Sequence, residues 1–124
     1  MNRVSKKPGF TLVEILIVVS VIGLLAVLAL PGMMKARKRS MGIVILEEVR
    51  LMDAAIDEWI LERRKKDGLP IVTSEVASYL KGSWRDTDLF GHSYIIGLIG
   101  SNNITIAPET KQALDGVGID WGRF

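Results

Sequence analysis

An uncharged run of 20 residues, 15–34, constrains this chain more than any other feature. An α-helix rises about 1.5 Å per residue, so the run makes roughly 30 Å of helix, enough to cross the hydrocarbon core of a bilayer. The run is apolar on every side and offers no face to water. A chain of 124 residues cannot wrap such a helix completely, so the sequence favours a membrane span over a buried core helix.

Basic residues bracket this span on both sides. Three precede it and four follow it: Arg3, Lys6, Lys7, Lys35, Arg37, Lys38 and Arg39. The bracketing suits anionic lipid headgroups better than nucleic acid, so we expect membrane lipid as a partner and no nucleic acid as the primary ligand. Because bases flank both ends, the charges do not fix the orientation of the span.

The residue types that carry most catalytic chemistry are scarce in this sequence. It contains no cysteine and a single histidine, which excludes disulfides, thiolate metal sites and multi-histidine sites. It also has no glycine-rich phosphate loop, nucleophile elbow or paired-histidine motif. His92 follows Asp88 closely enough to suggest an acid–base pair, but a lone loop histidine is usually structural. The sequence therefore predicts no enzyme.

Two helix-weakening positions lie in the span, and a second helical pattern follows it. Pro31, followed by Gly32, predicts a kink or break, and Gly23 is a weaker point that costs about 1 kcal/mol relative to alanine. After residue 40, side chains of one helical stripe recur three and four positions apart: Ile45, Val49, Met52, Ile56, Trp59 and Arg63. The pattern predicts an amphipathic helix that ends near Lys66, before Asp67 and Gly68.

The remainder of the chain predicts a small mixed domain. We expect a short helix over residues 73–80, capped by Thr73 or Ser74, and β-strands over 93–99 and 103–107 joined by a hairpin turn. The tail, 117–124, is expected to add a strand or a turn. The fold class is thus α+β, with a long N-terminal helix whose stripe packs on a small antiparallel sheet. Its expected segments are a leader (1–9), a span (10–34), an amphipathic helix (35–66) and a globular head (67–124).

One carboxylate, Glu14, stands at the edge of the apolar run, four residues after Phe10. A carboxylate at membrane depth costs a few kcal/mol and marks a functional site by default. The alternative is that Glu14 lies at headgroup level and reaches water.

The sequence around Glu14 resembles a known processing signal. Residues 6–14 read Lys-Lys-Pro-Gly-Phe-Thr-Leu-Val-Glu and lead directly into the apolar run. This string is similar to the signal of type IV prepilins and type II secretion pseudopilins, in which a membrane peptidase cuts after the glycine and methylates the new N-terminus. The resemblance implies that Gly9 ends the leader, that Phe10 begins the mature chain and that Glu14 acts in assembly. Gly23 and Pro31 also fall where such subunits often carry these residues.

The resemblance implies a structural role. The chain would be a subunit of a type IV pilus-like or pseudopilus filament, stored in the inner membrane with an extracytoplasmic head and later found in an extracellular or periplasmic filament. Its partners would be copies of itself, the prepilin peptidase and the inner-membrane assembly machinery. Cleavage would free an α-amine on Phe10, whose pKa is near 8, to pair with Glu14 of an adjacent subunit.

The head carries a second, shorter likeness. Residues 88–94 look like a segment of pseudopilin heads, although Leu89 and Ser93 stand where prolines are usual. Such heads often bind calcium, and Asp115 and Asp120 are candidate ligands here. Calcium needs six to eight oxygen ligands, and the ligand-bearing loop of the family is not recognisable. We therefore predict no cofactor and leave calcium open.

Two other membrane-related readings compete with a filament subunit. A secreted protein with a cleaved signal peptide would have a shorter apolar core of 7–15 residues and a small-residue cut site, which this run lacks. A single-span anchored protein that is never cut and forms no filament stays open. The sequence also leaves open whether a filament would be a surface pilus or a secretion pseudopilus, and whether this chain is its major or a minor subunit.

Overall fold

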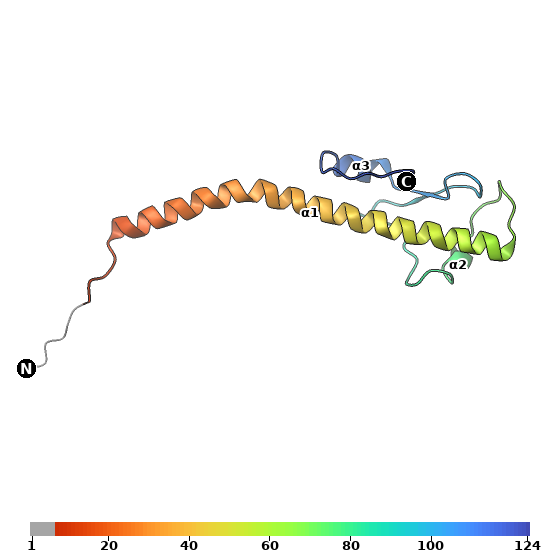
Figure 1. Ribbon diagram of the computed structural model, residues 1–124, viewed down its shortest axis with the longest axis horizontal. Coiled ribbons are helices and arrows are strands. Elements are labelled where there is room, and N and C mark those ends of the chain that lie inside the picture. Colours follow the sequence, from red (N-terminus) through yellow and green to blue (C-terminus); the bar gives the residue numbers. More distant parts are fainter. Residues whose placement is uncertain (1–6) are drawn as a thin grey trace, which may run out of the picture. The chain divides into compact units, whose positions relative to one another are not determined.

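The computed structural model describes residues 7–124, in two compact units, Met1–Lys35 and Ala36–Phe124, which we treat separately. The elements in order are α1 (Leu12–Arg63), α2 (Thr73–Val76), β1 (Ile95–Ile96), β2 (Ile104–Thr105) and α3 (Pro108–Ala113). Figure 1 labels the three helices. A long N-terminal helix followed by a small antiparallel sheet is the predicted α+β fold, which is therefore confirmed.

The first unit is an exposed helix. Every residue from 7 to 35 is solvent-exposed, including all of the apolar run. Among the residues that the structure describes, α1 alone is long and apolar enough to cross a membrane. It continues without interruption through Gly23 and Pro31, so the break considered at Pro31 is absent. A bend at Gly23 or Pro31 stays a prediction.

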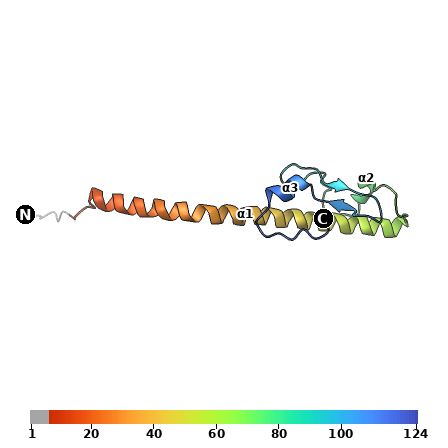
Figure 2. The ribbon, with the colours of Figure 1, turned by 90° about the horizontal axis from the view of Figure 1, so that it is seen from above.

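The second unit has a hydrophobic core built on one face of α1. Five side chains of the predicted stripe are at most 1% exposed: Ile45, Val49, Met52, Ile56 and Trp59. They pack against apolar residues from the rest of the unit, among them Val76, Tyr94, Ile99, Ile104, Ile106, Leu114, Val117 and Phe124. Figure 2 shows β1, β2 and α3 lying along this part of α1. The predicted helix register is therefore correct.

The sheet is smaller than the sequence predicts. β1 and β2 are antiparallel, with Ile95 opposite Thr105 and Ile96 opposite Ile104, and the predicted hairpin joins them. The first predicted strand stops at Gly97, where an added Cβ would lie 2.1 Å from the carbonyl oxygen of Asn102. Beyond it, Leu98 pairs with Pro70 instead of with β2. The β-forming run 93–99 is thus divided: its middle part pairs with β2, and Leu98 pairs with Pro70.

The ends of the helices also differ from the predicted ones. α1 ends at Arg63 because Arg64 adopts a left-handed conformation, with φ of 48°. α2 ends at Val76, because the residues after it form tighter turns, in which an N–H bonds to a carbonyl three residues earlier instead of four. The Tyr79 N–H, for example, donates to the Val76 carbonyl (2.9 Å). The predicted cap at Thr73 or Ser74 is wrong: the N-cap residue is Val72, and no side chain caps α2.

α3 was not predicted. It begins with Pro108 directly after Ala107, a position at which proline is favoured because its fixed φ suits the first helical turn. Glu109 in that turn adds a favourable charge at the helix N-terminus. The tail from 117 to 124 forms turns and no strand.

Trp59 gives a direct test of the core. Its side chain is fully buried, and its indole N–H donates a 3.0 Å hydrogen bond to Glu75 Oε2. We expect Trp59→Ala to lower the free energy of unfolding by roughly 3–5 kcal/mol, because the cavity cannot close completely. Urea unfolding of the detergent-solubilised chain, followed by circular dichroism, measures this.

The matched control for Trp59→Ala is Leu61→Ala on the same helix. The Leu61 side chain is 78% exposed, so its truncation should change the unfolding free energy by no more than about 0.5 kcal/mol. Equal effects of the two substitutions would show that the register of α1 against the core is wrong.

Candidate functional site

The predicted processing residues lie in an open segment before α1. Gly9 and Phe10 have no regular secondary structure, and the Phe10 side chain is 84% exposed. A Cβ added at Gly9 would meet nothing within 4 Å, so the fold of this unit leaves room around the peptide bond that follows it. Residues 1–6 of the predicted leader, with Arg3 and Lys6, lie outside the described residues.

Glu14 takes part in a capping box at the start of α1. The Thr11 N–H donates to Glu14 Oε2 (3.2 Å), and the Glu14 N–H donates to Thr11 Oγ1 (3.2 Å). This reciprocal pair satisfies two backbone donors that a helix N-terminus leaves free. This capping box was not predicted, although the spacing Thr11-x-x-Glu14 is the usual sequence signal for it.

The capping box places a negative charge close to Phe10. The positive end of the helix dipole favours a carboxylate in the first turn, so Glu14 is held where an anion is stabilised. An open hollow of about 520 Å³ lies beside it, lined by Phe10, Glu14, Ile15, Ile17 and Val18. Only one oxygen of Glu14 accepts the Thr11 bond, which leaves the other oxygen able to accept a further donor.

In the second unit, Asp88 organises the turn that the sequence likened to pseudopilin heads. Its side chain is buried, and Oδ1 accepts the backbone N–H groups of Phe90 (2.8 Å) and His92 (3.0 Å). Gly91 within the turn has a φ of 84°, a conformation that glycine adopts without strain. The segment is therefore a tight Asp-initiated turn.

Asp88 also ties this turn to α3. Its Oδ2 accepts a hydrogen bond from the hydroxyl of Thr110, which is fully buried. His92 Nδ1 lies 2.8 Å from Thr110 Oγ1 and 4.0 Å from Asp88 Oδ2. Because the hydroxyl proton of Thr110 points to Asp88, His92 Nδ1 is the donor to Thr110. The Asp88–His92 pair thus serves the fold, since both side chains are engaged with a buried threonine.

A second polar link joins α1 to the segment after α2. The Tyr94 hydroxyl donates to Glu48 Oε2 (2.9 Å), and Arg85 Nε lies 3.5 Å from Glu48 Oε1. Burial raises the pKa of Tyr94, and the hydrogen bond to Glu48 adds to this effect. The tyrosine therefore stays neutral and keeps donating to Glu48.

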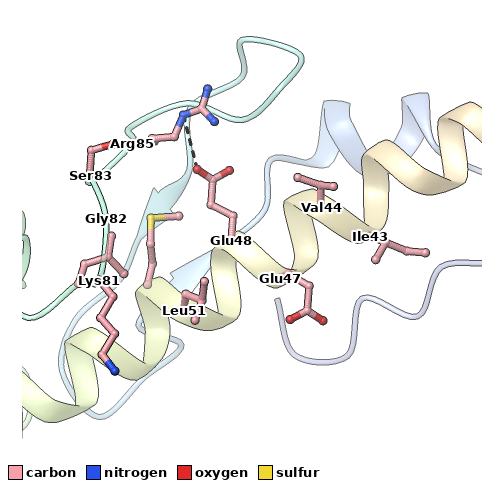
Figure 3. A pocket seen from close by; sticks show the side chains of 11 residues that line it. Ile43, Val44, Glu47, Glu48, Leu51, Lys81, Gly82, Ser83 and Arg85 are labelled. Atoms are coloured by element: carbon pink, nitrogen blue, oxygen red, sulfur yellow. Dashed lines mark ion pairs between the residues drawn. The ribbon is translucent and has the colours of Figure 1, made fainter.

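An open groove of about 410 Å³ lies beside this link, between α1 and the chain around residues 80–85 (Figure 3). Ile43, Val44 and Leu51 of α1 supply apolar surface to it. Its charged residues are of both signs: Glu47, Glu48, Lys81 and Arg85. The Arg85–Glu48 ion pair crosses one end, which leaves the groove without a dominant charge.

A buried carboxylate on α1, which the sequence analysis did not single out, holds the C-terminal segment. Asp53 is only 5% exposed and forms an ion pair with Arg123. Asn103 Nδ2 donates to Asp53 Oδ1 (3.2 Å) and to Asp57 Oδ1 (2.9 Å). A buried charge needs a partner, so these contacts fix the C-terminal segment and the β2 side of the hairpin on α1.

The two candidate calcium ligands, Asp115 and Asp120, each serve a local turn. Asp115 Oδ1 accepts the N–H of Gly116 (2.9 Å), and Asp120 Oδ1 accepts the N–H of Gly122 (3.0 Å). Within residues 7–124, no three Asp, Glu, His or Cys side chains gather as a metal site would require.

Comparison with known proteins bears on the N-terminal motif and on the whole chain. The model of the prokaryotic N-terminal methylation motif matches residues 4–30. The type IV major fimbrial protein FimA of Dichelobacter nodosus is 32% identical over 117 residues, which is 94% of this chain. The chain is thus similar to type IV pilins at its N-terminal motif and over most of its length. It spans 63% of the length of FimA, and no solved structure matches it significantly.

Similarity to pilins agrees with the chemistry of the structure. In residues 7–124 the clustered polar side chains cap a helix, close turns or fix the C-terminal segment. The matched residues 4–30 include much of the exposed apolar part of α1, which fits anchoring in a membrane.

Thr110 tests the link between the Asp88 turn and α3. Thr110→Val keeps the shape of the side chain but removes the hydroxyl, which leaves the buried Asp88 Oδ2 without its donor. We expect the free energy of unfolding to fall by about 1–3 kcal/mol. Thr87→Val is the control, because Thr87 is exposed and should give a change of less than about 0.5 kcal/mol. A neutral Thr110→Val would contradict the role assigned to Asp88.

Proposed function

We propose that this chain is a type IV pilin-like filament subunit with a structural role, stored in the membrane as a precursor and assembled after cleavage following Gly9. The observation that carries the proposal is the match of residues 4–30 to the methylation motif. The matched residues include the first part of α1, whose apolar side chains have no partner within their own unit. Prepilin peptidase and the inner-membrane assembly machinery are the partners that this route requires.

The exposed apolar helix supports both storage and assembly. The large hydrophobic side chains between Leu12 and Met34 are 49–87% exposed. Each buried Å² of apolar surface contributes about 25 cal/mol, so this surface strongly favours a lipid or protein environment over water. Lipid covers it before assembly, and the same segment of neighbouring subunits covers it in a filament.

Cleavage supplies the second element of the mechanism. It creates an α-amine on Phe10, and this cation pairs with the Glu14 carboxylate of an adjacent subunit. Both charges would be costly alone among apolar helices, so the pair stabilises the filament only when neighbouring subunits are in the correct register. The capping box supports this role, since it leaves one Glu14 oxygen for the incoming amine.

Two observations bear on the kind of filament, and they favour different answers. We favour an extracellular type IV pilus-like filament, because the relative FimA is named a major fimbrial protein. The turn at residues 88–94 favours the alternative, a periplasmic secretion pseudopilus. Electron microscopy of cells that express the chain separates the two: long, shed filaments that bind an antibody to the head support the pilus, and their absence supports the pseudopilus.

Gly9 tests the processing step. The fold leaves Gly9 uncovered, and a small residue before the cut lets the backbone enter a protease site at the membrane surface. We expect Gly9→Leu to leave full-length precursor in the membrane, with cleavage reduced at least about tenfold, which corresponds to 1.4 kcal/mol or more. Mass spectrometry of the purified chain measures the fraction that begins at Phe10.

The control at this position is Gly9→Ala, which keeps the residue small and should leave more of the chain processed than Gly9→Leu. If Gly9→Leu were cut as completely as the parent, the proposed cleavage site would be wrong. If the parent chain itself stayed intact in cells with the peptidase, the alternative of an uncut single-span anchor would replace the filament proposal.

Glu14 tests the assembly step. Glu14→Gln keeps an acceptor for the Thr11 N–H, so the capping box survives while the charge is lost. Glu14→Ala removes both the charge and the cap. We expect both variants to be inserted and cleaved like the parent, and both to lose at least about tenfold in filament yield, because each leaves the Phe10 amine without its counter-ion.

Two quantities decide the outcome for Glu14: the fraction of chain cleaved, and the fraction recovered in sheared, pelleted filaments. For both variants we expect the fraction in filaments to fall while the cleaved fraction stays at the parental value. Filament loss in Glu14→Ala but not in Glu14→Gln would assign Glu14 to helix capping alone. Parental yield in both would overturn the charge-pair mechanism.

A further inference from the structure

His92 uses only one of its two ring nitrogens within the head. Nδ1 donates to the hydroxyl of Thr110, which in turn donates to the buried carboxylate of Asp88. These two hydrogen bonds fix the tautomer of the neutral ring, because the proton is held on Nδ1 and Nε2 keeps a lone pair. Within residues 7–124, the hydrogen bonds of His92 involve its backbone and Nδ1, and none involves Nε2. The ring therefore keeps one acceptor for a further partner.

The imidazole of His92 is held in one orientation by contacts on several sides. Thr110, which anchors Nδ1, is fully buried. The backbone N–H of His92 donates to Asp88 Oδ1 (3.0 Å), and the Phe90 ring stacks on the imidazole with centroids 6.5 Å apart. Because Nδ1 faces the buried threonine, Nε2 lies toward the exposed end of the side chain, which is 37% exposed. A group held in place in this way loses less conformational entropy when a ligand binds.

An open hollow of about 540 Å³ lies beside the imidazole, where β1 and the start of α3 supply its other walls. Its apolar surface comes from Ile95, Ala107 and Pro108. Apolar surface of this kind can cover the methylene groups of a flexible ligand and gains free energy when it does so. The hollow therefore suits a ligand that carries an alkyl chain.

The polar groups of the hollow are mainly acceptors, and its charge is negative. Glu109 supplies an exposed carboxylate that forms no ion pair within residues 7–124. Ser93 adds a hydroxyl, which can accept or donate. Among the described residues, no lysine or arginine lines the hollow. Together with the lone pair on Nε2, these groups complement a ligand that is a cation and a hydrogen-bond donor.

We propose that this hollow binds the side chain of a lysine or an arginine on a partner protein. The ammonium or guanidinium donates to Nε2 of His92 and to the carboxylate of Glu109, while the apolar walls cover the methylene stem. Long basic side chains have this combination of an apolar stem and a charged end. The binding does not depend on filament assembly, because every residue that lines the hollow belongs to the head.

Apolar side chains at the rim of the hollow favour a protein over a small free amine. Leu89 is 40% exposed and Phe90 is 36% exposed, and both directly precede the lining residue Gly91. Ile95, which lines the hollow itself, is 50% exposed. A free amine would leave most of this surface in water, whereas a protein that presents a basic side chain would cover it as well. Anionic lipid is disfavoured, because its headgroups would be repelled by the carboxylate.

The chain has a single histidine, so its ring nitrogens can be observed without ambiguity in the full chain. Nitrogen-15 spectra of the detergent-solubilised protein above neutral pH should show a protonated Nδ1 and an unprotonated Nε2 on His92. Addition of a capped Leu-Arg-Leu peptide should then shift the Nε2 signal to saturation. A ring that is protonated mainly on Nε2, or a signal that the peptide does not move, would overturn the proposal.

Matched ligands separate charge, hydrogen bonding and the contribution of the rim. Citrulline has the shape of arginine without its charge, and a peptide that carries it should bind about fivefold more weakly. Trimethyl-lysine keeps the charge of lysine but has no N–H to donate, so its peptide should bind more weakly than the lysine peptide. Equal binding within either pair would overturn the proposed contacts. If free agmatine bound as tightly as the arginine peptide, the hollow would be a site for small amines and not for a protein.

Substitutions test the two acceptors separately. Glu109→Gln should weaken binding of the arginine peptide about fivefold, whereas Glu58→Gln, at an exposed position of α1 outside the hollow, should leave it unchanged. Equal effects of these two substitutions would show that the hollow is not the site.

The relay behind His92 is tested at Thr110. Thr110→Val removes the acceptor for Nδ1, so the proton should redistribute between the ring nitrogens and the affinity for the arginine peptide should fall. Thr110→Ser keeps the hydroxyl and should preserve both the tautomer and the affinity. Circular dichroism establishes that each variant is folded, and Glu109→Gln still tests the site if Thr110→Val is not. Parental affinity in a folded Thr110→Val chain whose tautomer has changed would overturn the role of Nε2.

Discussion

The physical constraint on which the rest of this structure depends is that a single copy cannot cover the first part of α1. The apolar side chains there are exposed all round, and no other element of their own unit packs on them. Such a surface is tolerated in lipid or among identical helices, and not in water. This segment therefore needs lipid or other apolar helices around it, and the proposed function supplies first one and then the other.

The part of α1 in the second unit has a different role: it carries the hydrophobic core of the head. One side is covered by a compact core centred on Trp59, while polar links from Glu48 and Asp53 fix the loops on either flank. These links tie segments that contain little regular secondary structure of their own, since β1 and β2 have two residues each. The helix thus acts as the scaffold for the head, and side-chain contacts replace an extended sheet.

The sequence predicted the features that depend on periodicity or on a short linear motif. The uncharged run and the buried stripe follow from spacing, and the hairpin follows from the turn-forming residues 100–102 between two β-rich runs; the structure has all three. It did not predict features that depend on contacts between distant residues. The division of one β-rich run at Gly97 and the burial of Asp53 against Arg123 cannot be inferred from local pattern, because their partners lie elsewhere in the chain. The capping box at Thr11 and Glu14 and the helix start at Pro108 both have local sequence signals and could have been predicted from them. They were not predicted, because stronger patterns in the neighbouring residues were interpreted first.

The non-covalent contacts that hold the C-terminal segment on α1 determine in which environments the head can fold. Arg123 reaches Asp53 through charge, and Asn102 Nδ2 donates to the Arg123 carbonyl (3.2 Å), so the closure is non-covalent in a chain that has no cysteine. Folding of this head requires no thiol oxidation, and its rate does not depend on an oxidase or an isomerase. The same subunit can reach its native state in a reducing or an oxygen-free environment, where a disulfide-closed head would wait for an oxidant.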